Sequence, residues 1–333
     1  EGKELITNLI TAPGKDAGLF LTNLKIKGWL DYETLSELRN DIIIVTLKGD
    51  RKGRPQVDYT VNPALGIPEI TGHEESTEPV ANAIPAWDMI AGNMCVSSLL
   101  AAERYRLRHG VGQDVEIALK DVAAAAIGHL GMIADSTLNT DDRSKAGNAL
   151  YGAYGKDFLC ADGNRVMIIG LTSRQWSGIL KATDTTEQFK NLENEKNIDL
   201  NDEAIRWKWR HEITAILEPW FKTRAVEDFA RDFDNTGLTW SVFRSVKEAL
   251  EFDPDLSEDN PLFKKIKQPD AGEFLVPRHP ANFSKVDNTE AKGAPALGEH
   301  TEEILGDILH LSDIEISNLF DKGVVASPTY NKN

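Results

Sequence analysis

The sequence feature that most constrains the fold is residues 41–49 (DIIIVTLKG), which are almost wholly apolar and rich in β-branched side chains. Such a run predicts a buried β-strand. A second apolar run, residues 19–23, predicts another buried strand, and residues 30–40 between them predict a helix with Asp31 as its cap. A strand, a helix and a strand joined by short links predict a βαβ unit, so the expected fold class is α/β.

Asp58 lies soon after this unit, where a turn-rich loop meets the start of a short predicted helix. The backbone amides at a helix start stabilise negative charge, so a carboxylate held there can serve as a nucleophile or a base. Aspartate at a helix start is more often a simple cap, which satisfies those amides and has no chemical role. The local pattern leaves both interpretations open.

The composition is that of a globular chain, and its charge narrows the class of partner. The net charge of −16 argues against nucleic acid or an anionic membrane as the main partner. No apolar run approaches the length that crosses a bilayer, so no membrane partner is expected. Cys95 and Cys160 are the only cysteines in 333 residues, which indicates a reducing compartment and predicts a cytoplasmic protein.

Familiar motifs for metal or nucleotide chemistry are missing from the sequence. None of the seven histidines pairs with another histidine or a cysteine at the spacing of metal ligands, so no metal site is expected. There is no phosphate-binding P-loop, and the glycines at 110 and 112 lack the rest of the dinucleotide fingerprint. Asp58 is therefore the main candidate for chemistry.

The order of the predicted strands, helices and connectors along the chain predicts a division into domains. Residues 1–158 are expected to form a large domain, and residues 159–280 a smaller α/β domain with a strand at 164–171 and a long helix at 203–223. Residues 281–333 are expected to form a connector and short helices that return to the large domain. The chain begins without Met and with a helical pattern, so we expect a further N-terminal part of the large domain to precede Glu1.

Motifs spread from end to end resemble the family III CoA-transferases of the CaiB/BaiF type, a group that also includes acyl-CoA racemases. The matching segments are Asp58 with Gly66, residues 85–88 (PAWD), residues 99–106 (LLAAERYR), Gly110 with Gly112 and Gln113, residues 162–167 (DGNRVM) and residues 294–305 (APALGEHTEEIL). The resemblance implies a large Rossmann-like domain that binds CoA and holds the catalytic residue, a smaller α/β domain, and an interlocked homodimer.

The resemblance also implies an enzyme that acts on an acyl-CoA and needs no separate cofactor, because the CoA thioester is itself the substrate. Asp58 matches the family's nucleophile. Its carboxylate would attack the thioester to give a mixed anhydride and CoA thiolate, and the thiolate would then attack the aspartyl carbonyl to give an enzyme–CoA thioester. Asn23 and Leu24 match a segment that contacts CoA in the family, although this chain is one residue longer there and lacks the family's aromatic residue.

Within the family, residues 57–72, 118–135, 147–158 and 171–176 are most similar to members that move CoA from one carboxylate of a five-carbon diacid to the other. Intramolecular CoA transfer is therefore the expected activity. Transfer between two free acids, racemisation, and a truncated relative that only dimerises remain alternatives. The racemases use a histidine upstream of the aspartate, whereas the first histidine here, His73, follows Asp58.

The remaining site candidates lie further along the chain. Tyr151 and Gly152 belong to a glycine- and tyrosine-rich loop, residues 147–155, which is expected to close over the substrate and to supply amide donors. A flexible connector is the alternative interpretation of this loop. The candidate for the free carboxylate of the substrate is Arg143, with Arg165 and Arg174 as further possibilities.

Overall fold

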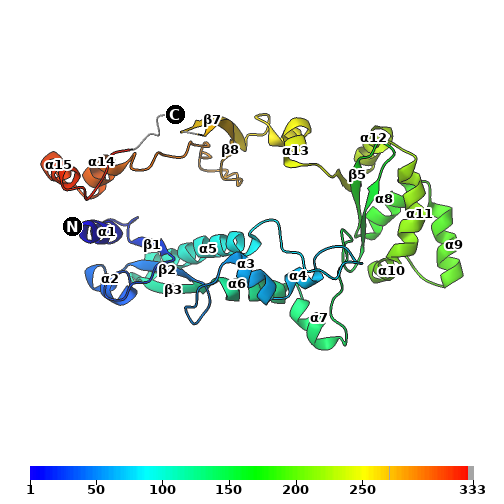
Figure 1. Ribbon diagram of the computed structural model, residues 1–333, viewed down its shortest axis with the longest axis horizontal. Helices are drawn as coiled ribbons and strands as arrows, with labels where there is room; N and C mark the ends of the chain where they lie inside the picture. Colours follow the sequence, from blue (N-terminus) through cyan, green and yellow to red (C-terminus); the bar gives the residue numbers. More distant parts are fainter. Residues whose placement is uncertain (270, 329–333) are drawn as a thin grey trace. The chain divides into compact units, whose positions relative to one another are not determined.

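The computed structural model describes residues 1–269 and 271–328, and the chain divides into two compact units (Figure 1). Unit 1 combines Glu1–Val61, Ile84–Leu130 and the chain from Lys247 onward. Unit 2 combines Asn62–Ala83 with Gly131–Val246. The three domain ranges expected from the sequence stay a prediction, because a compact unit of one chain is not by that fact a domain that folds alone.

Unit 1 contains a parallel three-stranded sheet in the order β1-β2-β3. β1 spans Leu19–Thr22, β2 spans Ile43–Lys48 and β3 spans Gln113–Ala118. The first four residues of the central strand β2 are buried, which explains its unbroken apolar sequence. α2, Tyr32–Leu38, connects β1 to β2, and the Asp31 carboxylate caps it by accepting from the Thr34 amide at 2.8 Å. The predicted βαβ unit and α/β fold class are confirmed.

The long helix α5, Ala86–His109, packs on β2, β3 and α6 (Leu119–His129). It ends at Gly110, whose φ of +71° lies in the left-handed region that glycine adopts without strain. Near that end, the buried Arg106 side chain donates to the carbonyls of Ala17 at 2.9 Å and Lys15 at 3.2 Å. These bonds tie the C-terminal end of α5 to the segment before β1.

The other elements of the N- and C-terminal segments are short. They are α1 (Gly2–Ile10), α3 (Asp58–Ala64), α13 (Val246–Phe252), the 3₁₀ helix η1 (Pro254–Leu256), β7 (Phe263–Gln268), β8 (Gly272–Pro277), α14 (Thr301–Glu303), the π-helix η2 (Ile304–Ile308) and α15 (Asp313–Asp321). β7 and β8 pair as an antiparallel hairpin.

Unit 2 is built on an antiparallel sheet in the order β4-β5-β6. Its strands are β4 (Tyr154–Leu159), β5 (Arg165–Gly170) and β6 (Thr239–Val242). Its helices are α4 (Ile67–Ile70), α7 (Met132–Leu138), α8 (Ser173–Ala182), α9 (Thr186–Lys196), α10 (Glu203–Lys208), α11 (Arg210–Lys222) and α12 (Val226–Thr236). An aromatic core that includes Phe158, Trp176 and Phe221 fills this unit, and the strand expected at 164–171 is confirmed.

The single helix expected over residues 203–223 is wrong. The chain breaks at Trp209, where φ is −102° and ψ is 21°, so α10 and α11 are separate helices. Trp209 packs against the aromatic core, and both helices contact β4. These tertiary contacts override the continuous helical pattern of the sequence.

Candidate active site

Asp58 is the first residue of α3 and is almost fully buried, at 1% exposure. Its Oδ2 accepts hydrogen bonds from the backbone amides of Trp87 at 2.7 Å and Asp88 at 3.3 Å. These amides belong to the first turn of α5, whose N-cap Pro85 contributes no side-chain hydrogen bond. Asp58 therefore begins one helix and caps a second helix that starts 28 residues later in the sequence.

The Asp58 carboxylate lies against the first turn of α5. The free amides of a helix's first turn carry partial positive charge, and they stabilise an anion that accepts from them. The pKa of the neighbouring Asp88 is raised, first by burial and then by repulsion from the charge of Asp58. The Asp58 carboxylate is a candidate nucleophile that lies against helix amides.

A cavity of about 850 Å³ in unit 1 is lined in part by Val57, the residue before Asp58, and by Asp88, whose amide donates to Asp58. It is lined by the C-terminal end of β2 and the loop that follows, together with Asn23, Val57, Asp88 and Gly92. Ligands of open α/β sheets bind at the carboxyl ends of parallel strands, and this cavity lies at such an end. Its volume is that of a site for a ligand of drug or cofactor size.

The cations that line this cavity differ in how exposed they are and in how they are paired with carboxylates. Lys25 donates to Glu116 at 2.8 Å, which raises the pKa of Lys25, and Lys48 pairs with the same carboxylate at 2.5 Å. Arg54 pairs with the buried Asp50 at 2.6 Å but is two-thirds exposed, with 66% of its side chain accessible. Arg54 is therefore the lining cation that can reach an anionic ligand with the least rearrangement.

Of the two residues expected to contact CoA, Asn23 lines the cavity and Leu24 is exposed beside it in sequence. Both follow β1 directly, and the Leu24 amide donates to the Thr22 hydroxyl at 2.9 Å in a tight turn. Of the two residues, the polar one, Asn23, therefore lines the cavity. The roles of both residues toward CoA stay a prediction.

The remaining candidates, Arg143, Tyr151 and Gly152, belong to unit 2. The guanidinium of Arg143 lies over the Tyr151 ring, 3.5 Å from its centroid, and the Tyr151 hydroxyl donates to Asp135 at 3.2 Å. Gly152 has a φ of +81°, which a residue with a Cβ adopts only under strain. The structure therefore brings Arg143 and Tyr151 into contact, whereas Asp58 and Asn23 belong to the other compact unit.

Arg143 also lines a cavity of about 220 Å³ between α4 and α7. Apolar residues such as Leu65 and Ile70 form part of this cavity, and Asp135 and Asp142 face it as well. An arginine that stacks on a tyrosine in a partly apolar cavity is suited to bind a carboxylate. Arg165, by contrast, pairs with the buried Asp157, and Arg174 lines a separate surface pocket next to α8.

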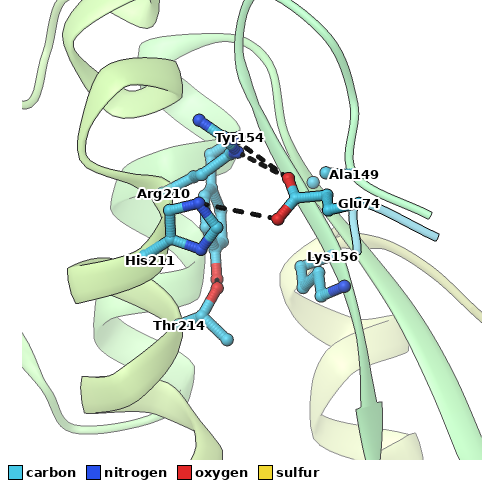
Figure 2. A pocket seen from close by; sticks show the side chains of 8 residues that line it. Glu74, Ala149, Tyr154, Lys156, Arg210, His211 and Thr214 are labelled. Atoms are coloured by element: carbon cyan, nitrogen blue, oxygen red, sulfur yellow. Dashed lines mark hydrogen bonds and ion pairs between the residues drawn. The ribbon is translucent and has the colours of Figure 1, made fainter. Parts of the chain in front are cut away.

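A further polar cluster in unit 2 was not indicated by the sequence. Figure 2 shows Glu74 facing two side chains of α11: it accepts from Arg210 at 3.0 Å and lies 3.6 Å from His211. The adjoining pocket of about 90 Å³, lined also by Tyr154 and Lys156, holds only a few waters. Glu74 precedes Arg210 by 136 residues, so no spacing pattern could have found this pair.

The described residues contain neither a metal-binding cluster nor a membrane-spanning helix. Within residues 1–269 and 271–328, no group of three or more His, Cys, Asp or Glu side chains could hold a metal ion. In the same part of the chain, every helix is too short or too polar to cross a membrane. Cys95 and Cys160 are free thiols that are both buried, and burial raises the pKa of Cys160 to about 11.

The chain is similar to several known proteins. The chain is 48% identical over 98% of its length to 2-methylfumaryl-CoA isomerase of Chloroflexus aurantiacus, of which it spans 80%. It is 24% identical over 89% of its length to human succinyl-CoA:glutarate CoA-transferase, of which it spans 66%. A CaiB/BaiF family protein from Brucella suis has a similar fold, with a TM-score of 0.70 and 21% identity over 92% of this chain and 78% of that one.

The family model described as CoA-transferase family III matches residues 1–301, which is most of the chain. The resemblance expected from the sequence motifs is confirmed, and so is the expectation of an enzyme of this type. The chain belongs to CoA-transferase family III.

Proposed function

We propose that this chain catalyses intramolecular CoA transfer, converting 2-methylfumaryl-CoA to 3-methylfumaryl-CoA through a covalent intermediate on Asp58. The observation that carries the proposal is the placement of Asp58, a buried carboxylate that accepts from two helix amides and directly follows Val57, which lines a large cavity. The 48% identity to a protein named 2-methylfumaryl-CoA isomerase supports the choice of substrate.

The chemistry proceeds in four displacements. The Asp58 carboxylate attacks the thioester carbonyl and releases CoA thiolate, leaving a mixed anhydride. The thiolate attacks the aspartyl carbonyl and releases the diacid, leaving an enzyme–CoA thioester. The other carboxylate of the same diacid then attacks this thioester, and the released thiolate takes the acyl group from the new anhydride. Each step exchanges one activated acyl group for another, so no separate cofactor is needed.

Several residues would position the substrate in this scheme. We place CoA in the cavity lined by Asn23, with Leu24 at its margin and Arg54 as a cation for its phosphates. Arg143, supported by the Tyr151 ring, would bind the free carboxylate of the diacid. The loop with Tyr151 and Gly152 would close over the reacting groups, because an anhydride survives only where water is excluded.

We also propose that two copies form an interlocked homodimer in the cytoplasm. Large apolar side chains stay exposed on α5 and along the C-terminal segment, among them Met89, Leu100, Leu107, Phe283 and Leu297. Exposed apolar surface of this kind marks interaction sites on soluble proteins. The two buried thiols agree with a reducing compartment.

Transfer between two free acids is the second candidate, since the similar human protein is named succinyl-CoA:glutarate CoA-transferase. The test is to incubate the protein with unlabelled 2-methylfumaryl-CoA and carbon-labelled free 2-methylfumarate, and to follow both CoA esters by chromatography and mass spectrometry. We expect 3-methylfumaryl-CoA to form without label. Label in the product would favour the intermolecular reaction, and absence of conversion would contradict both.

A further inference from the structure

We propose that Lys145 is a positioning residue for Arg143, the arginine assigned above to the free carboxylate of the substrate. The buried ammonium group of Lys145 attaches residues 143–147 to the loop at residues 68–80, and this attachment sets the place of Arg143 in its cavity. The role toward the substrate rests on the proposed function, whereas the attachment itself belongs to the fold.

Lys145 is only 9% exposed. Its Nζ donates hydrogen bonds to three backbone carbonyls, those of Glu78 at 2.6 Å, Thr71 at 2.8 Å and Pro68 at 3.4 Å. A lysine ammonium has three N–H donors and no acceptor, so these carbonyls can satisfy all of its donors. Lysine is almost never buried unless its charge is paired or hydrogen-bonded, and at Lys145 the main chain supplies the hydrogen bonds.

A single loop supplies the three carbonyls. Pro68 belongs to α4 and Thr71 ends that helix, where carbonyls lack a partner within the helix. The Pro68 carbonyl also accepts from the Val80 amide at 3.0 Å, which closes residues 68–80 into a loop. At Gly72 the φ is +112°, and a Cβ would come within 3.1 Å of the Val80 side chain, so glycine suits this turn. The loop thus presents three carbonyls to one cation.

A backbone hydrogen bond supports the same attachment. Two residues after Lys145, the Gly147 amide donates to the Gly72 carbonyl at 2.9 Å. One side-chain ammonium and one main-chain amide therefore connect residues 145–147 to the loop at residues 68–80. The chain between Arg143 and Tyr151 begins from this fixed point.

The two attached segments also form the cavity that Arg143 lines. Residues of α4, among them Ile70, line this cavity together with Arg143, which precedes Lys145 by two positions. The carbonyls of Pro68 and Thr71, which accept from Lys145, come from α4 and its C-terminal end. The ammonium connects two lining segments directly, so the position of Arg143 relative to α4 depends on it.

The kinetic effect of losing this connection follows from the role of Arg143. In the proposed scheme the carboxylate bound by Arg143 does not react in the first displacement, so its contact is the same before and during that step. Removal of an interaction that is equal in the ground state and the transition state raises KM and leaves kcat nearly unchanged.

The test uses the variant Lys145→Ala, which removes the ammonium and most of its stem. Added n-propylammonium can replace the missing group, and 1-propanol has a similar shape without the charge. Lys190→Ala is the matched control, because Lys190 is exposed on α9. Amide hydrogen exchange at residues 68–80 and 143–151 is measured with each additive, together with steady-state kinetics on 2-methylfumaryl-CoA.

We expect Lys145→Ala to exchange about tenfold faster in both segments and to raise KM about tenfold, with little change in kcat. We expect n-propylammonium to restore both values, 1-propanol to restore neither, and Lys190→Ala to match the parent protein. If Lys145→Ala does not fold, Lys145→Met, which keeps an apolar stem, is measured in the same way without additives, and the same changes are expected.

Several results would overturn the inference. Unchanged exchange would exclude the attachment, and rescue by 1-propanol would exclude the role of the charge. Faster exchange with an unchanged KM, or unfolding of both variants, would leave Lys145 with a structural role alone. Failure of the parent protein to convert 2-methylfumaryl-CoA would contradict the proposed function, and hydrogen exchange would still decide whether Lys145 holds the two segments together.

Discussion

At the scale of single residues, a buried charged side chain can hold two parts of the chain together, and Arg206 is an example. Arg206 is fully buried and donates to three backbone carbonyls, those of Leu200 at 2.6 Å, Leu171 at 2.8 Å and Gly170 at 3.2 Å. Burial lowers the pKa of its guanidinium. The three bonds connect the end of β5 and the chain before α10, so Arg206 joins two segments that are distant in sequence.

We expect Arg206→Met to lower the free energy of unfolding by about 3 kcal/mol, because it keeps the volume but leaves three buried carbonyls without their charged donor. Arg231→Met is the matched control, since Arg231 is exposed on α12, and we expect a change of less than about 0.5 kcal/mol. Urea titrations followed by tryptophan fluorescence measure both. Equal stability of the two variants would contradict this account of Arg206.

The sequence could predict the residue type at the candidate site but not its surroundings. Asp58 was identifiable because it stands at a helix start and matches a family motif. That its amide partners come from α5, with a separation of 29 and 30 residues, depends on how two helices meet in space. The local cap interpretation was therefore incomplete, because the Asp58 carboxylate accepts from the amides of α5.

At the scale of elements, most helices and strands were predicted from the periodicity of apolar residues and from residues typical of helix ends. The apolar run that became β2 was identifiable, because the sequence itself encodes burial on both faces of the strand. The break at Trp209 was not, because it depends on packing against a core assembled from other segments. Strong local patterns survive folding, whereas a single indole contact can interrupt a helix.

The loop at residues 147–155 is held by side chains that lie far from it in the sequence. The Tyr151 ring packs against Trp207 of α10 at 4.9 Å, and the guanidinium of Arg210 lies 4.1 Å from the centroid of the Trp207 ring. With Arg143 over Tyr151, these side chains form a continuous stack in which two tilted aromatic rings lie between two cations. The stack attaches the loop to α10 and α11, which no spacing rule within the loop could have revealed.

At the scale of the whole molecule, the expected homodimer has a direct test. The exposed apolar side chains of α5 and the C-terminal segment would be covered by a second copy. We expect sedimentation to give twice the mass of a single chain, and we expect the urea midpoint to rise with protein concentration, because association stabilises the folded state by mass action. A monomer mass at micromolar concentration, with a midpoint independent of concentration, would contradict the dimer.

The central claim is that Asp58 becomes covalently acylated during turnover, and one measurement tests it most directly. The protein is mixed with 2-methylfumaryl-CoA, quenched with hydroxylamine and digested, and the Asp58 peptide is examined by mass spectrometry. Asp58→Asn serves as the control, because its amide oxygen can still accept from the α5 amides while its nucleophilicity is lost. We predict an aspartyl hydroxamate at Asp58 in the parent protein, and neither hydroxamate nor turnover in the variant. An unmodified Asp58 peptide during undiminished turnover, or an active Asp58→Asn variant, would contradict the account.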